Sequence, residues 1–194
     1  MENKSALVEV SAGGAFVRTA SAHRNVIGAS PAFPPESGRY LLVVCRACPW
    51  ANRCITVRAL YGLEEVVPMI ACHPTWAATK PEVDGHRGWV FSAPNDAPRK
   101  HPSGENEVAC DDGCIPPPEG LNWTSVRSIY DASGAEDSTK FTVPVLWDLK
   151  QGTIVNNESS EIIRMLYDPK CLGQFATKNK DLDLYPTHLA DQIE

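Results

Sequence analysis

Residues 40–54, YLLVVCRACPWANRC, decide the fold and carry three of the seven cysteines in this chain of 194 residues. The run 39–46 is rich in leucine and β-branched residues, which is typical of a strand buried on both faces. After Pro49 the apolar residues recur at helical spacing as far as Gly62, which predicts a helix that ends there. The stretch therefore predicts a buried strand that leads into a helix, with the cysteines grouped around their junction.

The position of Pro49 indicates which cysteine begins the helix. Read alone, Cys45-Arg-Ala-Cys48 is a CxxC pair whose first thiol would attack from a helix N-terminus. If Cys45 capped the helix, however, Pro49 would lie beyond the first turn at a cost of about 3 kcal/mol. If Cys48 is the N-cap, Pro49 takes the first helical position, where its missing N–H is not needed.

We therefore expect Cys48 at the positive end of the helix, where unpaired N–H groups and the helix dipole favour a thiolate. Cys45 then lies inside the strand, and both Cys45 and Cys54 are expected to be buried and inert. The alternative is that Cys48 is itself only a small buried side chain.

Further elements are predicted on both sides of a long irregular segment. Residues 64–71 read as a second strand, near a sheet edge because Pro68 cannot donate to a ladder. Residues 72–122 are rich in Pro, Gly, Asp and Asn, with only 88–92 suggesting an extended run; such a segment is usually functional or a mobile insertion.

The second half of the chain predicts a helix, a hairpin and a last helix. The first helix is expected over 123–131, and the hairpin over 142–157 turns at 150–152. The last helix covers 158–168 with Asn157 as its N-cap. Strand, helix, strand, helix, hairpin and helix is the order of the α/β thioredoxin-like fold.

Composition and charge narrow the class of function. Hydrophobic residues make up 43% and charged residues 22% of the chain, which are values of an ordinary globular protein. A formal net charge of −6 leaves no basic face for nucleic acid or anionic lipid, so small-molecule or protein partners are expected. The sequence shows no secretory signal and no run long enough to span a membrane, which predicts a cytoplasmic protein with reduced thiols.

A zinc site is an alternative use of the cysteines. Cys110 and Cys114 stand four positions apart, and His73, His86 or His101 could complete a ligand set. Because no second close pair stands at a recognisable zinc-binding spacing, we expect no metal.

Several blocks resemble the Xi-class glutathione transferases, also called glutathionyl-hydroquinone reductases. The CPWANR block is similar to the Cys-Pro-Trp-Ala active-site motif of that family. The other blocks follow in the family's order: GGAFVRTASAHRNVI (13–27), GWVF (88–91), TVPVLWD (142–148), GTIVNNESSEIIRML (152–166) and DLYPTHL (183–189).

The resemblance implies a glutathione site with Cys48 as the nucleophile. Trp89 would lie along glutathione, and Glu158 and Ser159 would hold its γ-glutamyl end, which suits a helix N-terminus. The Val143–Pro144 bond is expected to be cis. The segment that reads the glutathione backbone would be Lys140, Phe141, Thr142 and Val143, with Lys140 where the family usually has arginine.

The resemblance also implies how the chain is divided. Residues 1–38 would be an N-terminal extension and 39–168 the thioredoxin-like glutathione-binding domain. Residues 169–194 would be a linker and the start of an all-α C-terminal domain that is otherwise missing, together with its aromatic-substrate pocket and proton-donating tyrosines. A homodimer is possible if the full-length protein exists.

Three classes of function remain open. The first is a reductase that removes glutathione from glutathionyl-hydroquinones through a Cys48-glutathione disulfide. Ala51 stands where dithiol glutaredoxins keep a second cysteine, so an external glutathione would resolve that disulfide. The second class is a general glutaredoxin-like deglutathionylase, and the third is a non-catalytic thioredoxin-like domain.

Overall fold

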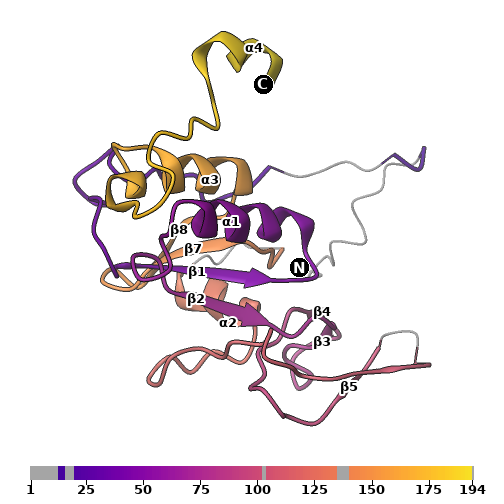
Figure 1. Ribbon diagram of the computed structural model, residues 1–194. Helices are drawn as coiled ribbons and strands as arrows, with labels where there is room; N and C mark the ends of the chain where they lie inside the picture. The colour runs from indigo at the N-terminus through magenta and orange to yellow at the C-terminus, as the bar shows by residue number, and fades with distance from the viewer. Residues whose placement is uncertain (1–12, 16–19, 102–103, 135–139, 194) are drawn as a thin grey trace.

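A mixed four-stranded sheet forms the centre of the molecule (Figure 1). The computed structural model describes residues 13–15, 20–101, 104–134 and 140–193. The strand order is β2-β1-β7-β8, in which β1 is parallel to β2 and the other neighbours are antiparallel. These strands are β1 (Tyr40–Cys45), β2 (Met69–Cys72), β7 (Val145–Asp148) and β8 (Thr153–Asn156).

Helices cover both faces of this sheet. Helix α1 (Pro49–Leu60) and α3 (Ser159–Tyr167) pack side by side on one face, and α2 (Val126–Ala132) lies on the other (Figure 1). The chain closes with η2 (Leu172–Phe175), η3 (Thr187–Leu189) and α4 (Ala190–Ile193). The βαβ unit, α2 and the ββα unit make the thioredoxin-like arrangement, which confirms the predicted fold. None of the described helices is both long and apolar enough to cross a membrane.

The predicted burial of the first strand on both faces and the predicted edge position of the second strand are confirmed. All six residues of β1 are buried, because β1 has a neighbour on each side and helices on both faces. Strand β2 is at the edge of the sheet, and Pro68 directly precedes it. Pro68 has no N–H to donate, but its carbonyl oxygen accepts a hydrogen bond from Leu42 N at 2.9 Å.

Residues 73–122 form a long excursion that returns to the outer edge of β2. Ala71 and Ile115 exchange two backbone hydrogen bonds of 2.9 and 3.0 Å. Within the excursion, β3 pairs with β4 and β5 with β6, each over two residues: β3 (Ala77–Ala78), β4 (Arg87–Gly88), β5 (Arg99–Lys100) and β6 (Glu107–Val108). The excursion therefore shields the sheet edge that β2 would otherwise expose.

The first helix begins as the position of proline predicts. Cys48 is the N-cap in extended conformation (φ −94°, ψ 117°), and Pro49 is the first helical residue. Asn52 N donates the first helical hydrogen bond to Cys48 O at 3.0 Å. The helix ends at Leu60, and Gly62 follows in the left-handed region at φ +63°.

Replacing Gly62 by alanine is expected to lower the free energy of unfolding by at least about 2 kcal/mol. An added Cβ would overlap the Thr177 hydroxyl and lie 2.9 Å from Lys178 Cγ, besides the strain of a positive φ. Gly38→Ala is the control, because Gly38 has φ +75° with no atom within 4 Å of the added Cβ. We expect Gly38→Ala to lower the free energy of unfolding by about 1 kcal/mol, from backbone strain alone. Urea denaturation measures both variants. Equal losses in the two variants would show that the contact with Thr177 has no effect.

The predicted N-cap of the last helix is wrong by one residue. Glu158, not Asn157, is the N-cap of α3, and its carboxylate accepts a hydrogen bond from Ser160 N. Asn157 points elsewhere: its amide nitrogen donates to the Tyr130 hydroxyl at 2.9 Å, and its amide oxygen accepts from His23 N at 3.2 Å. These distant partners outcompete a local cap, because they satisfy both ends of the Asn157 amide.

Candidate active site

Cys48 lies at the N-terminus of α1 against the segment that precedes the cis peptide bond Val143–Pro144. Its Sγ donates to Val143 O at 3.6 Å, and 8% of the residue remains exposed. Cys48 N donates to Cys45 O at 3.0 Å, which fixes the turn between strand and helix. The structure thus brings together the predicted nucleophile and one of the predicted glutathione-binding residues, at the place where the dipole of α1 favours negative charge.

The other two cysteines of the opening stretch have no exposed surface. Burial raises the pKa of the Cys45 thiol to about 11 and the pKa of the Cys54 thiol to about 12. Both thiols are therefore protonated at neutral pH and poor nucleophiles. The expected burial of Cys45 and Cys54 is confirmed.

Glu158 and Ser159 lie at the N-terminus of α3, beside α1. The Glu158 carboxylate is 14% exposed and accepts from Ser21 Oγ at 3.0 Å. Arg53 of α1 approaches both residues: its Nη2 donates to Ser159 Oγ and lies 3.6 Å from Glu158 Oε1. Cys54 Sγ donates to Ser159 O at 3.7 Å, so the second turn of α1 packs against the N-terminus of α3.

Arg53 and Ser21 are contacts of the site that were missed from the sequence. Arg53 lies in the CPWANR block, five positions after Cys48. This block was matched to the active-site motif from the sequence, but the contact of Arg53 with Glu158 and Ser159 was not predicted. Ser21 lies in the segment predicted as an N-terminal extension. Residues 23–25 of that segment follow β8, with Asn25 N donating to Val155 O at 3.1 Å. This pairing places Ser21 beside Glu158, at the N-terminus of α3.

Tyr130 of α2 connects two of the predicted binding segments. Its buried hydroxyl donates to Thr142 O at 3.1 Å and accepts from the amide nitrogen of Asn157 at 2.9 Å. Phe141 packs edge-on against the Tyr130 ring, with 5.5 Å between ring centroids. Phe141 and Thr142 are half-buried, as is Lys140 before them. Tyr130 therefore holds the segment before the cis bond in register with the N-terminus of α3.

Trp89 lies on the excursion rather than on the main sheet. Its half-buried ring packs edge-on against Trp76, with 5.4 Å between centroids, and its carbonyl oxygen accepts from Val126 N at 3.0 Å. A neighbouring side chain links this segment to the rest of the site, since His86 packs edge-on against Phe141 at 5.1 Å. His86, three positions before Trp89, therefore contacts one of the predicted binding residues, whereas the Trp89 ring itself contacts Trp76.

The cysteines and histidines of the excursion do not gather into a metal site. Cys110 and Cys114 are buried close to one another, and burial, with Cys110 as neighbour, raises the pKa of Cys114. Among the residues described by the structure, no group of three or more His, Cys, Asp or Glu side chains could hold a metal ion.

Comparison with known proteins shows the family of the chain. Residues 47–168 match the family model described as glutathione S-transferase, N-terminal domain. The chain belongs to this family. A glutathione S-transferase omega-like 2 of Schizosaccharomyces pombe is 36% identical to this glutathione S-transferase domain over 182 residues, which cover 93% of the chain and 50% of that protein. A glutathionyl-hydroquinone reductase of Escherichia coli is 34% identical, over 95% of the chain and 50% of that protein.

Solved structures confirm the resemblance to the Xi class. The Xi glutathione transferase of Saccharomyces cerevisiae in complex with glutathione matches with a TM-score of 0.71 and 33% identity, over 90% of this chain and 52% of that one. The glutathione-bound structure of an Escherichia coli homologue matches with a TM-score of 0.67 and 30% identity, over 89% and 49% of the two chains. The chain spans about half the length of the relatives that it matches.

Proposed function

We propose that this glutathione S-transferase domain binds glutathione and forms a mixed disulfide with it at Cys48. The observation that carries the proposal is the position of Cys48 Sγ, at the N-terminus of α1 and 3.6 Å from Val143 O. Glutathione-bound relatives of the same fold support glutathione as the ligand. The reaction requires a thiolate nucleophile, and Cys48 is the N-cap at the positive end of the α1 dipole.

In the proposed binding mode, backbone groups of the protein bind the peptide groups of glutathione, and Glu158 and Ser159 bind its charged γ-glutamyl end. The extended segment from Lys140 to Val143 pairs with the peptide groups of glutathione, as edge strands pair with peptide ligands. Glu158 and Ser159 hold the γ-glutamyl end, whose ammonium suits a carboxylate and whose carboxylate suits a helix N-terminus. Trp89 covers glutathione from the excursion.

The proposed reaction has two balanced steps. The Cys48 thiolate attacks the sulfur of a glutathionyl-hydroquinone; an S–S bond forms, the sulfur–ring bond breaks, and the ring carbon takes up a proton. A second glutathione, as its thiolate, then attacks the mixed disulfide, releasing glutathione disulfide and the Cys48 thiolate. The aromatic substrate is reduced by two electrons, and two glutathione sulfurs are oxidised to the disulfide: the thioether sulfur of the substrate and the thiol sulfur of the second glutathione.

Release of hydroquinone from a glutathionyl-hydroquinone, in the presence of glutathione, tests this function. Mass spectrometry of the intact protein after incubation with glutathione disulfide should show a single glutathione adduct on Cys48. A general deglutathionylase would release glutathione from aliphatic and protein mixed disulfides but would not release hydroquinone. A protein that forms no adduct would be a non-catalytic domain.

Replacing Arg53 by methionine is expected to raise the KM for glutathione by about tenfold, with a smaller change in kcat. Arg53 orients both residues that are proposed to hold the γ-glutamyl end, Glu158 and Ser159, but it does not touch the Cys48 thiol. Arg53→Lys keeps the charge beside Glu158 and should recover part of the affinity. An unchanged KM in Arg53→Met would show that Arg53 does not contribute to glutathione binding.

A further inference from the structure

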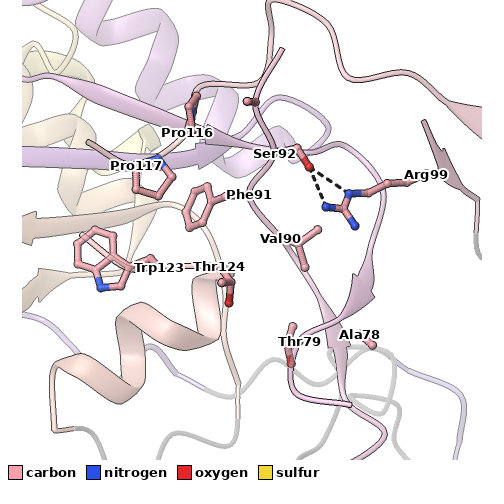
Figure 2. A pocket seen from close by; sticks show the side chains of 11 residues that line it. Ala78, Thr79, Val90, Phe91, Ser92, Arg99, Pro116, Pro117, Trp123 and Thr124 are labelled. Atoms are coloured by element: carbon pink, nitrogen blue, oxygen red, sulfur yellow. Dashed lines mark hydrogen bonds between the residues drawn. The ribbon is translucent and has the colours of Figure 1, made fainter. Parts of the chain in front are cut away.

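A cavity of about 420 Å³ lies between the excursion and the residues just before α2, on segments whose lining residues include none of the predicted glutathione-binding residues (Figure 2). Its walls come from 78–79, 90–93 and 123–124, and from the loop that carries Arg99, Pro116 and Pro117. None of the described residues that line it is Cys48 or one of the predicted glutathione-binding residues. Its volume lies in the range of small-molecule sites.

One end of the cavity carries a positive charge. Arg99 is half-buried, and its Nε and Nη2 both donate to the Ser92 hydroxyl, at 3.1 and 2.9 Å. Figure 2 shows the third guanidinium nitrogen, Nη1, turned away from Ser92. Within the described part of the chain, no carboxylate lies within ion-pair distance of Arg99. The guanidinium is therefore oriented by a neutral hydroxyl and keeps donors for an anion.

Apart from the hydroxyls of Thr79 and Thr124, the other walls are mostly apolar. Phe91 is 8% exposed, and Trp123 is fixed by an edge-on contact with Trp147 at 5.0 Å between centroids. The rings of Pro116 and Pro117 complete this side of the cavity (Figure 2). Aromatic rings pack favourably, offset or edge-on, against such walls, and little side-chain entropy is lost because the walls are already ordered.

We propose that this cavity binds a small aromatic monocarboxylate, with the carboxylate on Arg99 and the ring against Phe91 and Trp123. A guanidinium matches a carboxylate through two parallel hydrogen bonds. Because Arg99 has no carboxylate within ion-pair distance among the described residues, a ligand with one negative charge would balance it. The proposal is independent of the glutathione site and gives the loop 95–122 a role, since that loop supplies the cation and both prolines.

Titration calorimetry with benzoate tests the proposal, with benzyl alcohol as a neutral aromatic control of similar size. We expect benzoate to bind and benzyl alcohol to bind at least about tenfold more weakly. Arg99→Gln should weaken benzoate by at least about tenfold. Lys100→Gln, the same change at the next and exposed position, should leave its affinity unchanged.

Two further measurements locate the ligand in the intact wild-type chain. In the wild-type chain we expect nuclear Overhauser effects between the benzoate ring protons and the Trp123 indole protons, which would place the ring at Trp123. Saturating glutathione should not displace benzoate. Absence of benzoate binding, equal affinity in Arg99→Gln, competition by glutathione, or equal binding of inorganic phosphate would each overturn the proposal.

Discussion

Replacing Cys48 by serine is expected to lower the rate of hydroquinone release by at least about 10³-fold, because a hydroxyl at the same place is neither ionised at neutral pH nor able to form the disulfide. Cys48 is the N-cap of α1 and its side chain makes no capping hydrogen bond, so serine should not weaken the helix. The measurement is steady-state turnover of a glutathionyl-hydroquinone, together with adduct formation by mass spectrometry.

Cys45→Ser is the matched control, since Cys45 is the other thiol of the same CxxC pair. Its Sγ is buried and donates to His73 O at 3.7 Å, a bond that a serine hydroxyl can replace. We expect turnover to be kept in this variant. Loss of turnover in Cys45→Ser with retention in Cys48→Ser would contradict the helix register derived from Pro49.

The junction of β1 and α1 could be predicted from sequence because its determinants are local. Whether Pro49 occupies the first helical position depends only on the residues around it, and the structure has Cys48 as N-cap as expected. The buried strand and the hairpin turn at Gly152 likewise depend on short runs of side chains and on one positive φ, +64°. These features need no knowledge of distant contacts.

The missed residues all act through contacts between distant parts of the chain. Arg53 meets Ser159 across 106 positions, and Ser21 meets Glu158 across 137. The wrong N-cap has the same cause, because His23 and Tyr130 engage the Asn157 side chain from elsewhere in the chain. Periodicity describes which residues share a helix face, but it does not say which side chain that face will meet.

The excursion could not be predicted for a further reason. Its strands are two residues long, too short to show any alternation of apolar and polar residues, and β3 and β4 are joined across a Pro- and Gly-containing loop. The cavity that includes Arg99 depends on the return of this segment to β2 through Ile115. Composition indicated an irregular segment correctly, but it could not indicate what that segment encloses.

Replacing Asp148 by asparagine is expected to lower the free energy of unfolding by about 3–5 kcal/mol, because it leaves a buried arginine without its counter-charge. Asp148 is fully buried and Arg39 is 8% exposed. Arg39 Nε lies 2.9 and 3.1 Å from the two carboxylate oxygens, and Nη2 lies 2.6 Å from Oδ2. Urea denaturation at neutral pH measures the loss. Glu36→Gln, which removes a partly exposed carboxylate from the same arginine, should change the free energy of unfolding far less.

The same pair predicts how stability depends on pH. Burial acts to raise the pKa of Asp148, but the hydrogen bonds from Arg39 and from the Gln151 and Lys150 amides, with the Arg39 charge, outweigh it and lower that pKa. A carboxyl whose folded pKa lies below its unfolded value of about 3.9 stabilises the fold above that pH, and the stabilisation is lost as the pH falls through the folded pKa. Wild type should therefore lose more stability than Asp148→Asn when the pH is lowered from 5 to about 3. Parallel curves for the two proteins would show that the carboxylate of Asp148 is not held ionised by Arg39, and the large loss expected at neutral pH would then need another cause.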